Sequence, residues 1–384
     1  MASLEKNSGL LIILVLLVAI PPAIVGQIIE NPAKPKAVNA GRVVIPDEVL
    51  SVSDEGTRDF YFEVPHDLTI APDGALLLLD KFQVLQFDKY GKFVRNLYRK
   101  GQGPGEMSNV VRSCLTTARN IIVLGDSPSK LIFFDYEGTF QKEIPLRDMA
   151  GPKLRPKISL AIGPIFYLKS ADWPQGKGDP KFMEVPNTII VLDASTSESR
   201  TLSSFSTISY VISGDGGRET GLYEISTFLA VPFNKRYLAL SHSSEYLIKI
   251  YDPAADKVIR EFRRAYERVK PEPRSEIEKV GNIKIGGKRY PRPEQRFQND
   301  VKTILTRANE IWAVTSTKDD SKGVLIDIFD DRGIYQDCFY LKLPRPALYS
   351  IGYPQGCALD GDFLWIVERD EDDICTIKKY RLAI

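Results

Sequence analysis

The chain offers few side chains for acid–base or metal chemistry, and their number limits what the protein can do. His66 and His242 are the only histidines, whereas a zinc site needs three or four nitrogen or sulfur ligands. The four cysteines lie in separate apolar segments without the paired spacing of a metal site. We therefore predict no zinc site and four buried free thiols, with a disulfide between Cys357 and Cys375 as the alternative.

Carboxylate and amide groups could instead hold calcium, which prefers oxygen ligands. The candidates are Asp67, Asn299, Asp300 and Glu368. The acidic run 368–373 lacks the glycine and the terminal glutamate of an EF-hand loop, so we interpret it as a solvated loop. None of these residues falls in a calcium-binding motif.

A glycine-rich stretch at 101–106 could present backbone amides to an anion. Pro104 lies between Gly103 and Gly105, which imposes a tight path on the chain. A phosphate-binding loop would be followed by Lys-Ser or Lys-Thr and a helix, and neither follows here. We interpret this stretch as a structural turn.

The elements that must position these side chains are indicated by a repeated pattern, an apolar run closed by Asp and often followed by Gly three residues later. The aspartates of the five copies are Asp88, Asp135, Asp193, Asp252 and Asp330, at intervals of 47, 58, 59 and 78 residues. A period of this size marks a unit that buries its faces only by stacking on copies of itself. In each turn, Asp accepts hydrogen bonds from nearby amides and Gly adopts a positive φ.

Each repeat contains short apolar segments that read as β-strands. In the first copy they are 68–71, 75–79, 84–87 and 93–98, joined by tight turns. Six such sheets predict an all-β fold, a six-bladed β-propeller of four-stranded antiparallel blades. The last copy ends after its third strand, so we predict that an N-terminal strand, either 42–45 or 49–52, closes the ring.

The segments 65–80 and 84–95 resemble the NHL-type repeat, and 99–106 resembles the loop between blades in exported bacterial propellers of the TolB-like group. The resemblance extends over residues 40–384. Propellers of this kind include binding scaffolds, lactonase-like hydrolases that hold calcium, and lyases that hold zinc with three histidines. The resemblance therefore implies the fold without selecting a function. With two histidines, this chain cannot supply the three zinc ligands of the lyases.

A propeller places the start of each inner strand and the end of the next strand on one face. Because inner strands line the central channel, polar side chains at this channel mouth can meet in one concave site. The predicted binding residues are His66, Asp67, Arg112, Asp300, Gln355 and Glu368. We expect His66 to be a hydrogen-bonded polar residue, and we predict no catalytic and no metal-binding residue.

The first 26 residues have the pattern of an export signal. Lys6 precedes an apolar run at 10–20, which is too short to span a bilayer and is followed by two prolines. We predict cleavage after Gly26, with an uncleaved anchor as the alternative, and an extracytoplasmic location, periplasmic or secreted. A linker at 27–40 then leads to the propeller at 41–384.

Charge is distributed unevenly along a chain whose net charge is +1. Residues 257–296 contain 13 Lys or Arg and 6 Asp or Glu, and we interpret about 263–296 as a basic insertion. It could contact an anionic partner or an envelope surface, or it could be solvated. The chain as a whole is not basic, so we predict no nucleic-acid partner.

The sequence thus predicts an exported, non-enzymatic propeller that binds a protein or a small ligand at the channel mouth. We expect a monomer without a cofactor and without a membrane span after signal cleavage. The alternatives are a calcium-dependent, lactonase-like hydrolase and a scaffold subunit of an envelope assembly.

Overall fold

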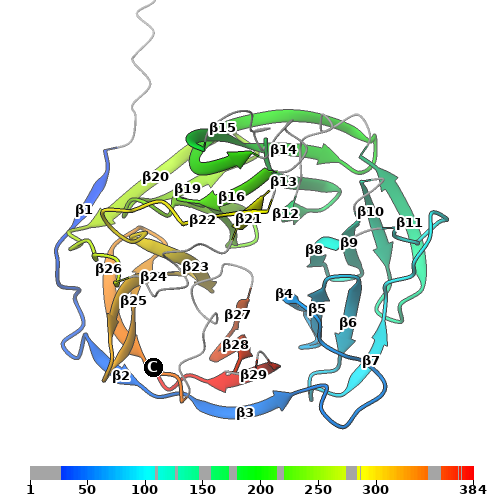
Figure 1. Ribbon diagram of the computed structural model, residues 1–384, viewed down its shortest axis with the longest axis horizontal. Coiled ribbons are helices and arrows are strands. Elements are labelled where there is room, and N and C mark those ends of the chain that lie inside the picture. Colours follow the sequence, from blue (N-terminus) through cyan, green and yellow to red (C-terminus); the bar gives the residue numbers. More distant parts are fainter. Residues whose placement is uncertain are drawn as a thin grey trace, which may run out of the picture.

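The computed structural model describes residues 27–108, 111–125, 129–146, 157–172, 180–213, 220–273, 283–285, 287–344, 356–370, 372 and 374–384. This part of the chain contains strands and turns and no helix. The strands form six sheets arranged in a ring, with a two-stranded sheet beside them (Figure 1). The fold is the six-bladed β-propeller that the sequence predicts.

Blades 1 and 2 have the four antiparallel strands expected from the repeat. Blade 1 contains β4 (Pro65–Ile70), β5 (Leu76–Asp80), β6 (Gln83–Phe87) and β7 (Phe93–Asn96). Blade 2 contains β8 (Val111–Thr116), β9 (Ile121–Gly125), β10 (Lys130–Phe134) and β11 (Phe140–Pro145). Every residue of the middle strands β5, β6, β9 and β10 is buried, because neighbouring blades cover both faces.

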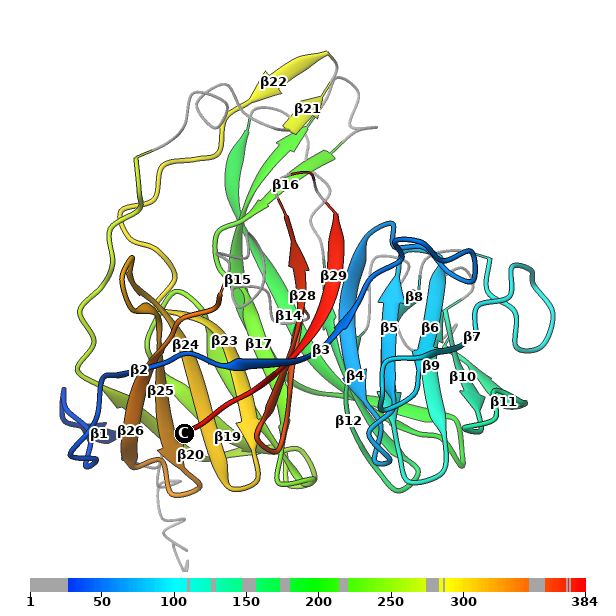
Figure 2. The same cartoon turned by 90° about the horizontal axis from the view of Figure 1, so that it is seen from below.

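Blade 3 is larger, and a hairpin of the basic insertion, which runs between blades 4 and 5 along the chain, packs against it. Its strands are β12 (Lys157–Ile162), β13 (Ile165–Ala171), β14 (Lys181–Asp193), β15 (Glu198–Ser213) and β16 (Thr220–Glu224). A hairpin of β21 (Ile283–Ile285) and β22 (Lys288–Tyr290) contacts β16, and these strands project from one face of the ring (Figure 2). The Tyr223 hydroxyl donates a hydrogen bond of 2.9 Å to the Tyr290 carbonyl, which attaches the insertion to blade 3.

Blades 4 and 5 each acquire a fifth, parallel strand from the N-terminal segment. Blade 4 contains β17 (Phe228–Phe233), β18 (Tyr237–His242), β19 (Ile248–Asp252), β20 (Lys257–Arg264) and β1 (Ile29–Asn31). Blade 5 contains β23 (Val301–Arg307), β24 (Glu310–Asp319), β25 (Gly323–Asp330), β26 (Tyr335–Leu341) and β2 (Arg42–Val44).

The segment 27–40, which the sequence predicts to be a linker, therefore belongs in part to the propeller. Three residues of β1 pair with β20, and the Ala37 amide donates to the Gln336 carbonyl of blade 5. A strand of three residues has too short a pattern to stand out from a linker, and its pairing depends on an edge that the ring provides.

Blade 6 closes the ring as the sequence predicts. It contains β27 (Cys357–Asp360), β28 (Phe363–Arg369), β29 (Cys375–Arg381) and β3 (Asp47–Val52). The N-terminal strand β3 pairs antiparallel with the C-terminal strand β29, with Val52 opposite Ile377. Of the two expected segments, 49–52 supplies the closing strand, whereas 42–45 largely forms β2 of blade 5.

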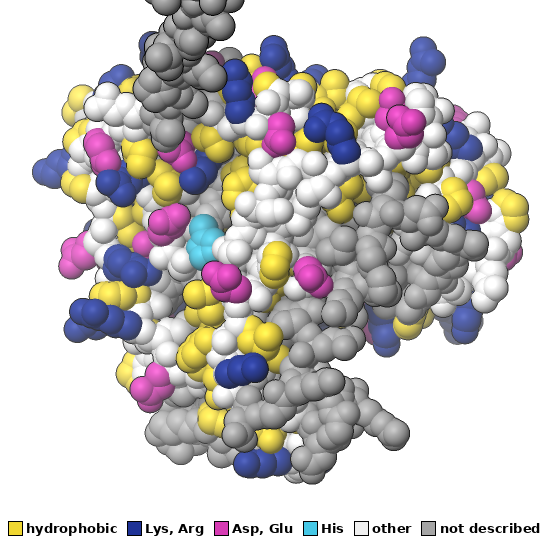
Figure 3. Space-filling view, turned by 90° about the horizontal axis from the view of Figure 1, so that it is seen from above, with side chains coloured by type: hydrophobic (Ala, Val, Ile, Leu, Met, Phe, Trp, Pro, Cys, Tyr) yellow, Lys and Arg dark blue, Asp and Glu magenta, His cyan; other side chains and the backbone are white. Residues whose placement is uncertain are grey.

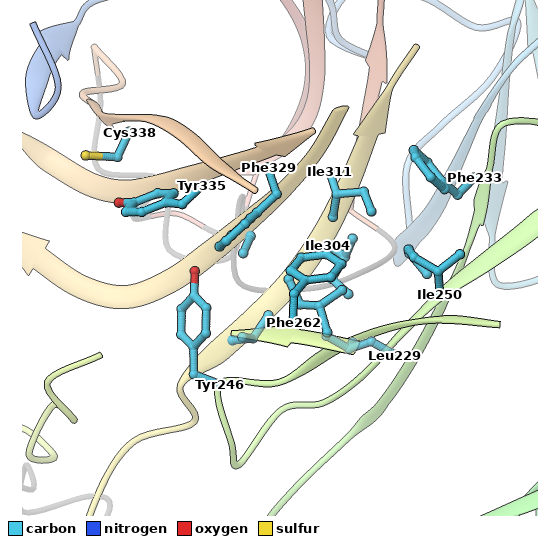
Figure 4. Close-up of a cluster of buried hydrophobic side chains, with 14 of the residues drawn as sticks. Leu229, Phe233, Tyr246, Ile250, Phe262, Ile304, Ile311, Phe329, Tyr335 and Cys338 are labelled. Carbon is cyan, nitrogen blue, oxygen red and sulfur yellow. The ribbon is translucent and has the colours of Figure 1, made fainter. Parts of the chain in front are cut away.

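Apolar side chains between the blades form the core. The inner strands contact one another in ring order: β4 with β8, β8 with β12, β12 with β17, β17 with β23, β23 with β27, and β27 with β4. Between blades 4 and 5, a buried cluster that includes Phe262, Phe329 and Tyr335 fills the space between the sheets (Figure 4). The six blades therefore fix one another's positions around the channel.

The glycines of the repeated turns do more than permit a positive φ. A Cβ atom on Gly333 of blade 5 would lie 2.6 Å from Phe262 of blade 4, and one on Gly138 of blade 2 would lie 2.7 Å from Arg95 of blade 1. Gly91 of blade 1 meets Val52 of blade 6 in the same way, at 2.8 Å. In each case the turn of one blade packs against the outer strand of the blade before it, so the repeat encodes contacts between blades.

We predict that Gly333→Ala lowers the free energy of unfolding by about 2–4 kcal/mol, because left-handed backbone strain adds to overpacking against Phe262. Gly361→Ala is the matched control, since Gly361 also has a positive φ, of 57°, but nothing lies within 4 Å of its Cβ position. Gly361→Ala should lower the free energy of unfolding by only about 1 kcal/mol. Urea denaturation of both variants measures the difference, and equal losses would contradict an inter-blade role.

The buried side chain of Asn31 joins blade 4 to blade 5. Its Nδ2 donates to the carbonyls of Arg263, at 3.1 Å, and Gly333, at 2.9 Å. Its Oδ1 accepts a hydrogen bond of 2.9 Å from the Tyr335 amide. The amide of one residue thus satisfies three backbone groups from two blades.

Asn31→Ala should destabilise the protein by about 1–3 kcal/mol, because it leaves buried backbone groups without partners. The exposed Asn39, in the same N-terminal segment, is the control, and Asn39→Ala should change stability by less than about 0.5 kcal/mol. The midpoint and slope of urea unfolding report both effects. No loss for Asn31→Ala would mean that the segment preceding β2 is dispensable.

Candidate functional site

The pairing of the first two strands is irregular near the start of several inner strands, at the channel mouth. In blades 1, 2, 3 and 5, the register between the first two strands shifts by one residue. The residues skipped by the pairing are His66, Arg112, Ser159 and Lys302. Such bulges turn a side chain out of its regular alternation and are common beside functional sites.

Two of these side chains line a hollow at blades 1 to 3, which we call the basic hollow. Its lining residues are Val64, His66, Lys81, Val111, Arg112 and Lys157, and its volume is about 420 Å³. His66 and Arg112, two of the predicted binding residues, thus come together from neighbouring inner strands. The Nδ1 atom of His66 lies 3.0 Å from the Val64 carbonyl, which orients the ring.

Asp67, a third predicted residue, stands beside this hollow and is coupled to it electrostatically. Burial raises the pKa of Asp67 to about 7, and the nearby Lys157 partly opposes that shift. The pKa of Lys157 is lowered, mainly by burial and also by Arg112, whereas Asp67 and Glu224 act in the other direction. These charged groups, from four strands, are therefore close enough to influence one another.

Behind Lys157 lies a second lysine that the sequence did not single out. Lys169 of β13 stands directly opposite Lys157 of β12 in the register of the two strands. Its Nζ donates to the Phe228 carbonyl and lies 5.4 Å from the centre of the Phe228 ring. Burial, with Lys157 contributing, lowers the pKa of Lys169 to about 8.

The candidate residues that the sequence did not single out are thus Lys157, Lys169 and Glu224. Lys157 is the first residue of the inner strand of blade 3, whereas the residue that matches Arg112 in the register shift is Ser159. An alignment of the repeats by their inner strands would therefore have pointed to Ser159, and no sequence signal singles out Lys157. Strongly perturbed titratable groups that share a cleft are a recognised sign of a functional site.

Of the other predicted binding residues, two form hydrogen bonds within the protein and one lies outside the residues that the structure describes. Asp300 is buried and accepts a hydrogen bond of 2.8 Å from Arg268 Nε; burial raises its pKa and Arg268 opposes the shift. Glu368 is buried and accepts a hydrogen bond of 2.6 Å from the Tyr380 hydroxyl. Neither lines the basic hollow, and Gln355 lies outside the described residues.

The carboxylates considered for calcium do not gather in the described part of the chain. No three His, Cys, Asp or Glu side chains there are grouped as a metal ion would require. Asp67, Asp300 and Glu368 belong to blades 1, 5 and 6, and the latter two are already bonded to Arg268 and Tyr380.

The amides of the glycine-rich stretch are occupied by the protein's own carboxylates. The Gly103 amide donates to Glu106 Oε2 at 2.9 Å, and the Gly105 amide donates to Glu143 Oε2 at 3.0 Å. Lys130, itself buried, pairs with Glu143 at 2.8 Å. This arrangement is that of a structural turn, as the sequence indicates.

The remaining nucleophiles and bases have no catalytic arrangement in the described residues. His242 lies between two hydroxyls, 2.6 Å from Ser244 Oγ and 3.3 Å from Ser226 Oγ, and no carboxylate contacts its ring there. The four cysteines, Cys114, Cys338, Cys357 and Cys375, are buried and form no disulfide. Burial and the neighbouring Asp67 raise the pKa of the Cys114 thiol, which makes it a poor nucleophile.

Basic and acidic side chains alternate over the surface shown in Figure 3, without a large patch of one sign. The described part of the chain contains no helix that is long and apolar enough to cross a bilayer.

Comparisons with known proteins support the fold. A family model described as a 6-bladed beta-propeller matches residues 55–154. A Bacteroides fragilis protein described as a "putative exported protein" is similar at a TM-score of 0.52 and 13% identity, covering 93% of this chain and 100% of its own. A Bacteroides vulgatus protein is similar at 0.52 and 10% identity, covering 89% and 99%. No curated protein matches the chain.

The raised pKa of Asp67 predicts a specific dependence of stability on pH. The raised pKa keeps a proton on Asp67 in the folded protein up to about pH 7, whereas the unfolded chain releases it near the ordinary pKa of 3.8. Stability from this residue is therefore full at low pH and is lost as the pH rises through about 7. Asp67→Asn removes that loss. At about pH 8 the free energy of unfolding of the variant should therefore exceed that of the parent by roughly 1–2 kcal/mol, a value reduced for screening by water in the channel.

Urea denaturation at several pH values between about 4 and 8 measures this difference. Asp59→Asn, at an exposed position, should leave the pH profile unchanged. Parallel profiles for the parent and Asp67→Asn would show that Asp67 titrates normally.

Proposed function

We propose that this six-bladed propeller binds a small anionic ligand, or an anionic group of a protein, in the basic hollow of the channel mouth. The observation that supports the proposal is the lining itself. Lys81, Arg112 and Lys157 face the hollow together with His66, and none of the described residues that line it is a carboxylate. A concave site with an excess of fixed cations attracts anions.

Burial strengthens this preference. Burial lowers the pKa of both Lys157 and the neighbouring Lys169, and the charge of Arg112 adds to the shift of Lys157 as that of Lys157 adds to the shift of Lys169. An anion in the hollow would relieve that repulsion, so its binding would favour the charged forms of both lysines. Arg112 adds a planar donor group suited to carboxylate or phosphate.

The alternatives receive less support. A calcium-dependent hydrolase would need several carboxylates at one point, and Asp300 and Glu368 are instead bonded to Arg268 and Tyr380. A Xanthomonas campestris protein described as a gluconolactonase is similar to this chain only at a TM-score of 0.44 and 11% identity, covering 92% of this chain and 98% of its own, which is too distant to bear on activity. We therefore favour binding over hydrolysis.

The proposal includes the finer classification and location. We place the chain with NHL-type and TolB-like propellers on the repeat in blades 1 and 2, and we infer an extracytoplasmic location from the signal-like first 26 residues. A monomer and an anionic small molecule or protein are the expected state and partner. The basic insertion on blade 3 is a second surface that such a protein partner could contact.

Arg112→Ala should weaken the binding of sulfate, used as a probe anion, by about tenfold or more, because it removes charge-assisted hydrogen bonds. Arg119→Ala is the matched control, since Arg119 is exposed in the turn at the far end of strand β8. Calorimetric titration with sulfate at constant ionic strength measures both. Equal affinities in the two variants would place the anion site elsewhere.

A further inference from the structure

We propose that the amine of Lys157 is a nucleophile that forms an imine with a small oxo acid, a ligand in which a carbonyl group adjoins an anionic group. This inference rests on the proposed function, because the hollow must hold the anionic group before the carbonyl can reach the amine. Three features of the structure support it: the position of the amine, the charges around it, and a carboxyl group that can exchange a proton.

The position of Lys157 allows it to meet a ligand bound by Arg112. Lys157 begins β12 and Arg112 is the bulged residue of β8, and these two inner strands contact each other. Both side chains line the same hollow of about 420 Å³. That volume lies toward the lower end of the range of small-molecule sites, so it suits a ligand of few atoms.

The surroundings of Lys157 favour the neutral amine, which is the form that attacks a carbonyl. The side chain is half-buried, and Lys169 stands directly opposite it on β13. Lys169 is held by the Phe228 carbonyl and ring, so its charge stays close to Lys157. A lysine that is desolvated beside other cations is a recognised form of activated amine.

Lys81 shows that this environment is particular to Lys157. Lys81 also lines the hollow, but it forms an ion pair with Glu63, and 40% of its side chain is exposed to solvent. The partner and the solvent both stabilise the ammonium form. We therefore expect Lys81 to contribute charge and Lys157 to contribute the nucleophile.

Asp67 can supply the proton that imine formation requires. The lone pair of the Lys157 nitrogen attacks the carbonyl carbon, and a proton moves from that nitrogen to the oxygen to give a carbinolamine. In the fraction of molecules whose Asp67 carboxyl group is protonated near neutral pH, Asp67 then donates that proton to the hydroxyl group, which leaves as water. The nitrogen lone pair forms the second C–N bond, which leaves a protonated imine and an Asp67 carboxylate.

The test traps the imine by reduction in the full-length protein. The protein is incubated with pyruvate and sodium cyanoborohydride, which delivers hydride to the imine carbon and leaves a stable secondary amine. Intact mass and peptide mapping then identify the modified lysine. We expect Lys157 to be modified several-fold faster than exposed lysines, because burial and Arg112 lower its pKa and so raise the fraction of neutral amine.

Matched variants show whether the reaction depends on the arrangement described. Lys157→Arg should abolish the fast adduct, whereas Lys34→Arg, at an exposed position outside the hollow, should retain it. Arg112→Ala and excess sulfate should each slow trapping, and Asp67→Asn should slow it without changing the modified residue. Urea denaturation confirms that each variant is folded, and peptide mapping of the parent gives the assignment without any variant.

The outcomes separate this inference from the proposed function. Modification spread over exposed lysines, or no adduct, would overturn the imine proposal, while sulfate binding that depends on Arg112 would leave the proposed function intact. Fast modification of Lys157 that neither sulfate nor Arg112→Ala affects would support the nucleophile and contradict the anion site. Fast modification slowed by both supports the two proposals together.

Discussion

The pairing of β3 with β29 is the interaction on which the rest of the structure depends. It joins the two ends of the propeller, and Lys378 on β29 reinforces it by donating to Glu48 on β3 at 2.6 Å. Without it, blade 6 would lack its outer strand, and the turn at Gly91 would lose the side chains of Leu50 and Val52 against which it packs. Closure also brings β27 against β4, which leaves no inner strand without a neighbour on either side.

Contacts between blades, both apolar and polar, then make the ring rigid. Arg264 of blade 4 pairs with the fully buried Asp327 of blade 5 at 2.8 Å. The hydroxyls of Tyr246 and Tyr335 donate to the same carboxylate, each at 2.5 Å, so the buried charge is well satisfied. Breaking such a pair costs far more than forming it gains, which makes it an effective constraint on how two blades fit together.

The basic hollow contrasts with these structural ion pairs. Arg264 and Lys130 each have a buried or half-buried carboxylate as partner, whereas Lys157 and Lys169 face each other and share the weaker influence of Asp67 and Glu224. Placing two like charges opposite one another is unfavourable. A rigid ring can hold this unfavourable arrangement in place, because the scaffold's stability comes from contacts elsewhere, and in the function proposed above a bound anion would relieve it.

The architecture could be predicted from the sequence because its signals are local. The repeated turn from Asp330 to Gly333 and its counterparts, the alternation of short apolar runs with turns, and the missing strand of the last copy were enough to predict six blades and their closure. The three-residue strand β1 escaped notice, since it carries almost no pattern of its own and is defined by its partner β20.

The candidate site was only partly predictable, and the reason is geometric. His66, Asp67 and Arg112 could be named because each begins an inner strand of a clear repeat. Whether a residue faces a ligand or a structural partner depends on neighbours from other blades: Asp300 meets Arg268, whereas Lys157 meets Lys169 and Asp67. The sequence by itself determined the strands, the turns and the closing of the ring, because hydrogen bonding and side-chain alternation act over a few residues. Only the tertiary structure decided which charges lie together, because their proximity and desolvation arise when strands distant in the chain converge at the channel.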